Sequence, residues 1–320
     1  YELLALLLPA RFSFPVAHVL WALFHVLLLA ILLVRILPFV AARYRALCAL
    51  MLIAYFPTIM ALKMGQDSII TTFLLAETFV NLKKQRYALA GGTLALGLYK
   101  PQFVLPLIGI LLLHRRWSSL LGFLLVALLL AAVSLAMVTW DGLIGLFALW
   151  LPMIDRGHVV WPELMTNLRG LAYVVLHPGG LAGATNGLTL ALSMVIYAVT
   201  LRLWPRSADT RSELFDLRYA LAVIMTALVS FHSYSYDATL LILPLVVMLN
   251  QVLKESGPYP VGHRVFLAAV TALFIPLLPN VLLSEAILAW WALPLPVLFA
   301  VTALEICRQR GPAVAVPAVR

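Results

Sequence analysis

Apolar stretches long enough to cross a lipid bilayer recur along the whole chain, and they restrict its fold more than any other feature. A spanning helix needs about 20 apolar residues, and the sequence offers about ten such stretches. Only 11% of the residues are charged, whereas about a quarter are charged in an ordinary soluble domain. The chain is therefore predicted to be an all-α, polytopic transmembrane bundle that forms a single domain over residues 1–320.

Basic residues set the predicted topology of this bundle. Short cytoplasmic loops of membrane proteins are rich in Lys and Arg. When the apolar stretches are threaded back and forth, most of the 22 Lys and Arg residues fall on one side of the membrane. The exceptions are Arg11, Lys63, Lys100, Arg156 and Arg169. This asymmetry accounts for the net charge of +9 without a nucleic-acid partner.

The threading predicts about nine full spans and one long outer loop. An interfacial segment, 1–13, precedes the first span. The loop at 140–183 is amphipathic and rich in Trp, Pro and Gly, so we expect short interfacial helices there. The nine predicted spans cover residues 14–37, 46–62, 67–82, 118–139, 184–204, 214–231, 236–253, 265–279 and 286–305.

Residues 87–113 lie between two basic clusters, KKQR and HRRW. A single helix would put these clusters on opposite sides of the membrane, whereas a hairpin of two short arms keeps both in the cytoplasm. The residue before a proline is pushed away from helical geometry, so Lys100-Pro101 is the predicted bend. An arm of about 13 residues reaches about 20 Å, less than the hydrocarbon core of about 30 Å. The hairpin therefore places Lys100 in the outer half of the membrane.

Several polar residues collect on the predicted outer side, and polar groups at membrane depth tend to mark function. Lys100 either binds a phosphate or extends to the interface as an anchor. His232 and Asp237 either share a pocket in which the imidazole binds phosphate or moves a proton, or form an aromatic belt with a solvated helix cap. Arg169, which follows Asn167 in TNLRG, either clamps a phosphate or belongs to a surface turn.

Other chemistry-bearing residues point less clearly to a role. The Gly-Gln-Asp turn at 65–67 either contributes to the site or is simply a helix cap that complements the helix dipole. Glu77 lies inside a predicted span, where a carboxylate is either protonated or paired. Cys48 and Cys307 predict neither a disulfide nor a metal site. The sequence has no Walker loop, zinc-ligand spacing or GxSxG motif, so a nucleotide-dependent enzyme of the soluble type is not expected.

Five segments carry a resemblance to a known family. They are YELLALLLPARFSFPVAHVLWALFHV (1–26), GQDSIITTFLLAE (65–77), RYALAGGTLALGLYKPQFVLPLIGILLLHRRW (86–117), TNLRG (166–170) and SFHSYSYDATLLILPL (230–245). Together they resemble glycosyltransferase family 87, the polyprenyl-phosphate-mannose-dependent mannosyltransferases of the GT-C superfamily. In that family a Gly-Gln turn opens a helix, a Lys-Pro pair joins two apolar helices, and a His…Tyr-Asp motif precedes a Leu-Pro helix.

The resemblance implies an inverting transfer of a hexose, expected to be mannose, from a polyprenyl-phosphate donor. The acceptor would be a cell-envelope glycan or glycolipid on the outer face of the plasma membrane, and neither a cofactor nor a metal is implied. GT-C enzymes usually carry the catalytic carboxylate in the first outer loop, so this carboxylate and one span are expected to precede Tyr1. The residues predicted to bind the donor phosphate and sugar are Lys100, His232, Arg169, Gln66, Asp67, Asn167, Tyr236 and Asp237.

Two other classes of function stay open from the sequence. Transporters and flippases of lipid-linked or small polar solutes often have helices broken near the midplane, and the Lys100-Pro101 bend fits that pattern. No repeat between the two halves of the sequence supports it, however. A scaffold subunit of a cell-envelope assembly is the other alternative, and it predicts that the outer polar residues tolerate alanine.

Overall fold

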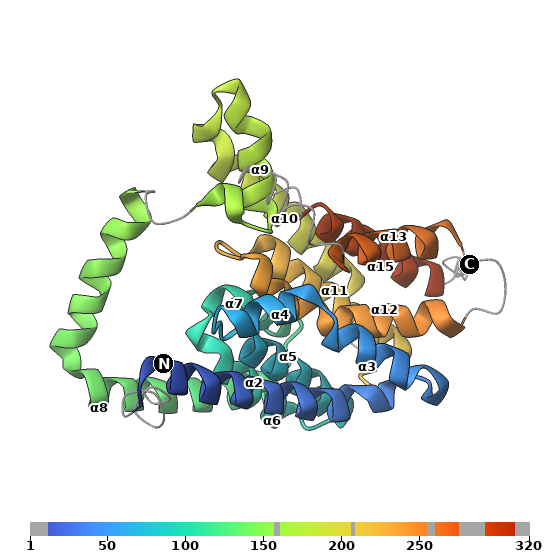
Figure 1. Cartoon of the computed structure of the whole chain (residues 1–320), viewed down its shortest axis with the longest axis horizontal. Helices are drawn as coiled ribbons and strands as arrows, with labels where there is room; N and C mark the ends of the chain where they lie inside the picture. The colour runs from blue at the N-terminus through green and yellow to red at the C-terminus, as the bar shows by residue number, and fades with distance from the viewer. Residues whose placement is uncertain (1–11, 157–160, 206–208, 255–259, 275–291, 311–320) are drawn as a thin grey trace, which may run out of the picture.

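The structure, a computed structural model, describes residues 12–156, 161–205, 209–254, 260–274 and 292–310. Every regular element within these ranges is a helix, which confirms the all-α prediction. Figure 1 shows α2 along one edge of the bundle and α13 and α15 at another, with α5, α11 and α12 between them. The expected interfacial segment at 1–13 lies almost entirely outside the described residues, as do 275–279 and 286–291 of the last two predicted spans.

The described residues form α-helices and short 3-10 helices. The α-helices are α2 (Phe14–Ile36), α3 (Arg45–Ile53), α4 (Phe56–Lys63), α5 (Ser68–Lys83), α6 (Tyr87–Ala95), α7 (Pro101–Leu113), α8 (Trp117–Arg156), α9 (Leu168–Leu176), α10 (Thr185–Leu203), α11 (Glu213–Val229), α12 (Ile242–Lys254), α13 (Val261–Phe274) and α15 (Pro294–Gln309). The 3-10 helices are η2 (Leu37–Phe39), η3 (Ala42–Tyr44), η4 (Leu96–Tyr99), η5 (Pro162–Leu164), η6 (His177–Gly179), η7 (Ala182–Ala184) and η8 (Ser235–Leu241).

Proline and hydroxyl caps explain where several of these helices begin. Pro15, Pro57, Pro101 and Pro294 lie in the first turns of α2, α4, α7 and α15. Proline is tolerated there because the amides of the first turn have no partner within the helix. Ser212 caps α11 by accepting a hydrogen bond from the Phe215 amide at 3.1 Å. Residues close in sequence therefore account for these helix starts.

Four helical segments within the described residues are long and apolar enough to cross a membrane: 14–39, 117–145, 182–203 and 235–254. The pair 42–53 and 56–63 makes a fifth if the two helices, bent by 43°, form one span. The chain is therefore an integral membrane protein with several apolar helices. The count of nine spans stays a prediction, since α5 and α11 have only 16 and 17 residues.

Burial separates the core of the bundle from its outer surface. In the most apolar window of η8 and α12, 83% of the residues are buried, against 6% in α8 and 11% in η7 and α10. Leucine side chains such as Leu125 and Leu129 on α8 and Leu190 on α10 are consequently exposed. In a bilayer such apolar surfaces face lipid at no cost, so α8 and α10 form the periphery of the bundle.

The predicted hairpin at 87–113 is confirmed. α6 and η4 form the first arm, α7 forms the second, and Lys100 lies at the break with φ −123° and ψ 71°. The glycines of α6 allow close packing, as the sequence predicts. A Cβ added at Gly91 would lie 1.8 Å from the Ser119 carbonyl oxygen, and one added at Gly122 would lie 1.9 Å from the Ala88 carbonyl oxygen. α6 therefore crosses α8 with its backbone in direct contact.

The predicted span at 118–139 ends where the structure has a break. α8 consists of two helical parts that meet at a kink at Thr139, which has non-helical dihedrals (φ 64°, ψ 169°), and its second part continues to Arg156. Figure 1 shows the distal half of α8 leaving the bundle at this break. The later part of the outer loop predicted at 140–183 forms short helices, as expected: η5, α9, η6 and η7.

Candidate functional site

Residues 230–237 comprise the connection after α11 and the first residues of η8. Most of the predicted site residues meet at this segment, which we call the 230–237 loop. The Tyr234 amide donates a hydrogen bond to Asp237 Oδ2 at 3.0 Å, and the Asp237 amide donates to the Tyr234 carbonyl at 2.9 Å. The Thr166 amide donates to the Ser233 carbonyl at 2.9 Å. Gln102, in the first turn of α7, donates to the His232 carbonyl at 3.5 Å. Elements far apart in sequence thus converge on one loop.

A buried group of three charges lies at one end of this loop. Lys100 Nζ lies 2.7 Å from Asp67 Oδ1 and 2.8 Å from Asp237 Oδ1. Only 11% of the Lys100 side chain and 3% of each aspartate side chain are exposed. We call Asp67, Lys100 and Asp237 the charge triad. It brings together the start of α5, the break between α6 and α7, and η8.

Hydroxyl groups complete the surroundings of the triad. Ser68 Oγ accepts a hydrogen bond from Lys100 Nζ at 2.9 Å and donates one to Asp237 Oδ1 at 2.6 Å. Tyr99, immediately before the lysine, donates to the Asp67 carbonyl at 3.1 Å. Asp67 occupies the N-cap position of α5, but its side chain makes no capping hydrogen bond. Both of its buried carboxylate oxygens lack hydrogen-bond geometry with any described residue, so its contact with Lys100 is a charge pair.

The remaining predicted residues of this region are Tyr236 and Gln66. The Tyr236 ring centroid lies 5.7 Å from Lys100 Nζ, which is within range of a cation–π contact. Gln66 lies in the turn before Asp67, where its backbone N–H donates a hydrogen bond to the Ala61 carbonyl at 2.8 Å. Trp21 of α2 holds the same turn, because its Nε1 donates to the Gly65 carbonyl at 3.0 Å. Both predicted residues therefore border the triad.

Asn167 and Arg169 attach α9 to the other end of the 230–237 loop. Asn167 is fully buried and caps α9 by accepting from the Gly170 amide at 3.1 Å. Its Nδ2 donates to the Ser230 carbonyl at 2.8 Å. The surface turn considered from the sequence is therefore excluded for Asn167. Its buried amide is a connection between two elements.

Arg169 presents a guanidinium group without a carboxylate partner among the described residues. Its Cζ lies 4.2 Å from the centroid of the Phe231 ring, and that ring is 51% exposed. Within the described ranges, its Nε and Nη1 atoms are buried and make no hydrogen bond. Burial lowers the pKa of Arg169 from its ordinary value, but an arginine side chain in a protein stays charged at neutral pH. A guanidinium with unsatisfied donors has the geometry to form paired hydrogen bonds with an oxyanion.

His232 lies between the triad and Arg169. Its half-buried ring contacts the Tyr234 ring edge-on, with the centroids 4.6 Å apart. Burial lowers the pKa of His232 below 6.5; the charges of Lys100 and Arg169 act in the same direction, and that of Asp237 opposes them. The imidazole is therefore mostly neutral at pH 7, and a neutral imidazole both donates and accepts a hydrogen bond.

The structure also answers the question left open for Glu77. Arg35 of α2 donates two hydrogen bonds to its carboxylate, Nε to Oε1 at 2.5 Å and Nη2 to Oε2 at 2.6 Å. Glu77 is therefore paired. This ion pair lies toward the other end of α5 from the triad. Ser68, Tyr99 and Phe231 are contact residues that the sequence reasoning missed, although each is a direct neighbour of a residue it singled out.

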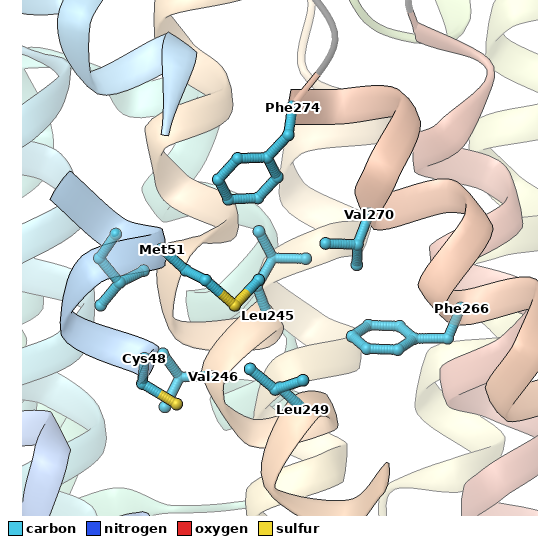
Figure 2. A pocket seen from close by; sticks show the side chains of 9 residues that line it. Cys48, Met51, Leu245, Val246, Leu249, Phe266, Val270 and Phe274 are labelled. Atoms are coloured by element: carbon cyan, nitrogen blue, oxygen red, sulfur yellow. The ribbon is translucent and has the colours of Figure 1, made fainter. Parts of the chain in front are cut away.

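An apolar crevice lies farther along α12. Figure 2 shows the side chains that line it. The lining residues are Cys48, Met51 and Leu52 of α3, Leu245, Val246 and Leu249 of α12, and Phe266, Val270 and Phe274 of α13. These side chains supply no group for acid–base or ionic chemistry apart from one thiol. The candidate site is therefore the polar region around the 230–237 loop.

Metal binding by the described residues has no structural support. Within these ranges, no three His, Cys, Asp or Glu side chains are grouped so as to hold a metal ion.

Comparison with known proteins identifies the family of the chain. A comparison with curated proteins and another with solved structures gave no match. The model of glycosyltransferase family 87 matches residues 2–231, a segment that includes Asp67, Lys100 and Arg169 and ends just before His232. Because this match spans well over half of the chain, the protein belongs to glycosyltransferase family 87.

Proposed function

We propose that this membrane glycosyltransferase transfers a hexose, mannose in the first instance, from a polyprenyl-phosphate donor to a cell-envelope glycan or glycolipid. Family membership supports the transferase activity. The unpaired guanidinium of Arg169 at the half-exposed edge of the 230–237 loop, as far as the described residues extend, supports an anionic donor. The positive-inside asymmetry supports an active site on the extracytoplasmic side of the plasma membrane.

The proposed reaction is a single displacement. The acceptor hydroxyl oxygen forms a bond to the anomeric carbon, and the bond from that carbon to the phosphate oxygen breaks. The electron pair stays on the leaving polyprenyl phosphate. The hydroxyl proton passes to a carboxylate base, and we assign this role to none of the described residues. Negative charge grows on the leaving phosphate, so a cation placed there stabilises the transition state more than the ground state.

Arg169 is the residue we propose to stabilise this leaving phosphate. Its planar fork of N–H donors fits two phosphate oxygens at once. His232, close enough for Arg169 to lower its pKa, would donate a hydrogen bond to the phosphate or the sugar. We propose that Tyr236 and Gln66 border the sugar and that Asn167 and Asp237 hold the loop in place. The single observation on which this assignment depends is the absence of a carboxylate partner for Arg169 among the described residues.

The test replaces Arg169 and measures sugar transfer from polyprenyl-phosphate mannose by purified full-length protein. Arg169→Ala is expected to lower kcat by about 10²–10³-fold, the usual cost of losing one transition-state donor. Arg169→Lys is expected to recover part of the activity, because it keeps the charge and loses the bidentate geometry. The matched control is Arg202→Ala, which removes an exposed arginine. In the predicted topology this arginine lies on the cytoplasmic side of the membrane. Full activity of Arg169→Ala would rule out the phosphate role.

The same preparation separates an enzyme from a transporter. Reconstituted protein that moves solute or lipid-linked sugar across vesicles, without any transfer to an acceptor, would favour the transporter or flippase. Transfer that depends on the donor lipid favours the glycosyltransferase.

A further inference from the structure

The charge triad gives Lys100 a different role from the phosphate contact that the sequence suggests. An ammonium group has three N–H donors and no acceptor. Three partners lie within 2.9 Å of Lys100 Nζ: Asp67 Oδ1, Asp237 Oδ1 and Ser68 Oγ. Two carboxylates pair with its single positive charge, and it donates hydrogen bonds to Asp237 and Ser68. A phosphate could reach this ammonium only by displacing a buried partner.

We infer that Lys100 is a positioning residue, which locks the 230–237 loop to α5 and so presents His232 and Phe231 to the donor. This inference rests on the proposed function. Asp237 is the connecting group, since one of its oxygens contacts Lys100 and Ser68 and the other accepts the Tyr234 amide. A lysine at the α6–α7 break thereby determines where the loop backbone lies.

The loop is held at both ends, and Phe231 and His232 near its first end are the part that reaches the surface. At its first end, the buried Asn167 amide holds the Ser230 carbonyl. At its last end, the triad holds Asp237. Phe231, which lies against Arg169, is exposed, and His232 is half-buried. Two buried attachments therefore keep in place the short exposed segment that the proposed function needs.

The triad also has an excess of one carboxylate, which makes the lysine indispensable for a reason other than ligand binding. Removing one partner of a buried ion pair leaves an uncompensated charge, which is far more harmful than removing the whole pair. Lys100→Met leaves two buried carboxylates without a cation. The triple variant Lys100→Met, Asp67→Asn, Asp237→Asn has no charge there. The carboxamide that it introduces in place of the Asp237 carboxylate still offers an oxygen to the Tyr234 amide.

Hydrogen–deuterium exchange and donor kinetics on these variants test the inference. If Lys100 positions the loop, Lys100→Met should accelerate exchange of the Tyr234 and Asp237 amides on the order of 100-fold. The triple variant should restore most of this protection, together with the KM for the donor and kcat. Asp67→Asn alone, which leaves Lys100 paired with Asp237, should change the donor KM by less than about threefold.

If Lys100 instead binds the donor phosphate, the variants should give different results. The triple variant would then keep the raised donor KM of Lys100→Met even after the loop regains protection, and Asp67→Asn would lower the KM by freeing the ammonium. Either result would overturn the inference. The exchange measurements need no sugar transfer, so they decide the positioning role even if the transferase assay fails. The kinetic measurements on wild-type protein judge the proposed function separately.

Discussion

Among the uncharged residues of the site, we expect substitution of Asn167 to reduce stability most, because its buried side chain makes two hydrogen bonds with different effects. Its oxygen caps α9 through the Gly170 amide, and its nitrogen holds the Ser230 carbonyl of the loop. Loss of an N-cap costs about 1 kcal/mol. Leaving a buried carbonyl unsatisfied costs about 1–3 kcal/mol. Asn167→Ala should therefore lower the free energy of unfolding by about 2–4 kcal/mol.

Two further substitutions separate the two contributions. Asn167→Ser keeps a capping oxygen but cannot reach Ser230, so it should lose only the second contribution. Asn167→Asp keeps the cap but points a carboxylate oxygen at the Ser230 carbonyl, now 2.8 Å from Nδ2, and should be at least as harmful as alanine. Unfolding by denaturing detergent in mixed micelles gives the free energies, and the donor KM reports the loop.

The matched control for Asn167 is Ser212→Ala at the start of α11. Ser212 also caps a helix, through the Phe215 amide at 3.1 Å, but lies away from the 230–237 loop. It should cost about 1 kcal/mol and leave the donor KM unchanged. The reasoning is refuted if Asn167→Ala costs less than Ser212→Ala, or if Asn167→Ser raises the donor KM no more than the control does.

Two other changes follow from the geometry. Gly122→Ala puts a Cβ 1.9 Å from the Ala88 carbonyl oxygen, so α6 and α8 must separate. The free energy of unfolding should fall by about 1–3 kcal/mol. Gly183→Ala, with nothing within 4 Å of its added Cβ, should leave the free energy of unfolding unchanged in the same assay. His232 has a pKa below 6.5 in the folded protein, so the unfolded chain binds more protons just below pH 6.5. Stability should therefore fall as the pH drops through 6.5 toward the folded pKa, and this loss should disappear in His232→Gln; identical pH profiles of the unfolding midpoint would contradict the assignment.

Local rules were enough to predict the hairpin at Lys100. The residue before a proline avoids helical geometry whatever surrounds it, and the positive-inside rule fixed which way the two arms return. The same rules placed Asp67, Lys100 and His232 on one side of the membrane. Their gathering at one loop in the structure agrees with that predicted shared depth.

Pairing between charges was beyond those rules. Lys100 and Asp237 are 137 residues apart, and Arg35 and Glu77 are 42 residues apart, so no local pattern links them. The sequence offers several outer cations and several outer carboxylates, and only tertiary packing selects the partners.

The two outer cations near the 230–237 loop differ in what packing gives them, and this difference argues for separate roles. Lys100 is enclosed by two carboxylates and a hydroxyl, while Arg169 is placed against an exposed ring without a counter-ion in the described part of the chain. A group that stabilises charge developing in a transition state must be available and already oriented. A group that maintains that orientation must be held in place by its own hydrogen bonds and ion pairs with neighbouring residues. The arginine meets the first condition and the lysine the second, so a lipid-phosphate donor is expected to bind the guanidinium while the ammonium stays in its buried triad.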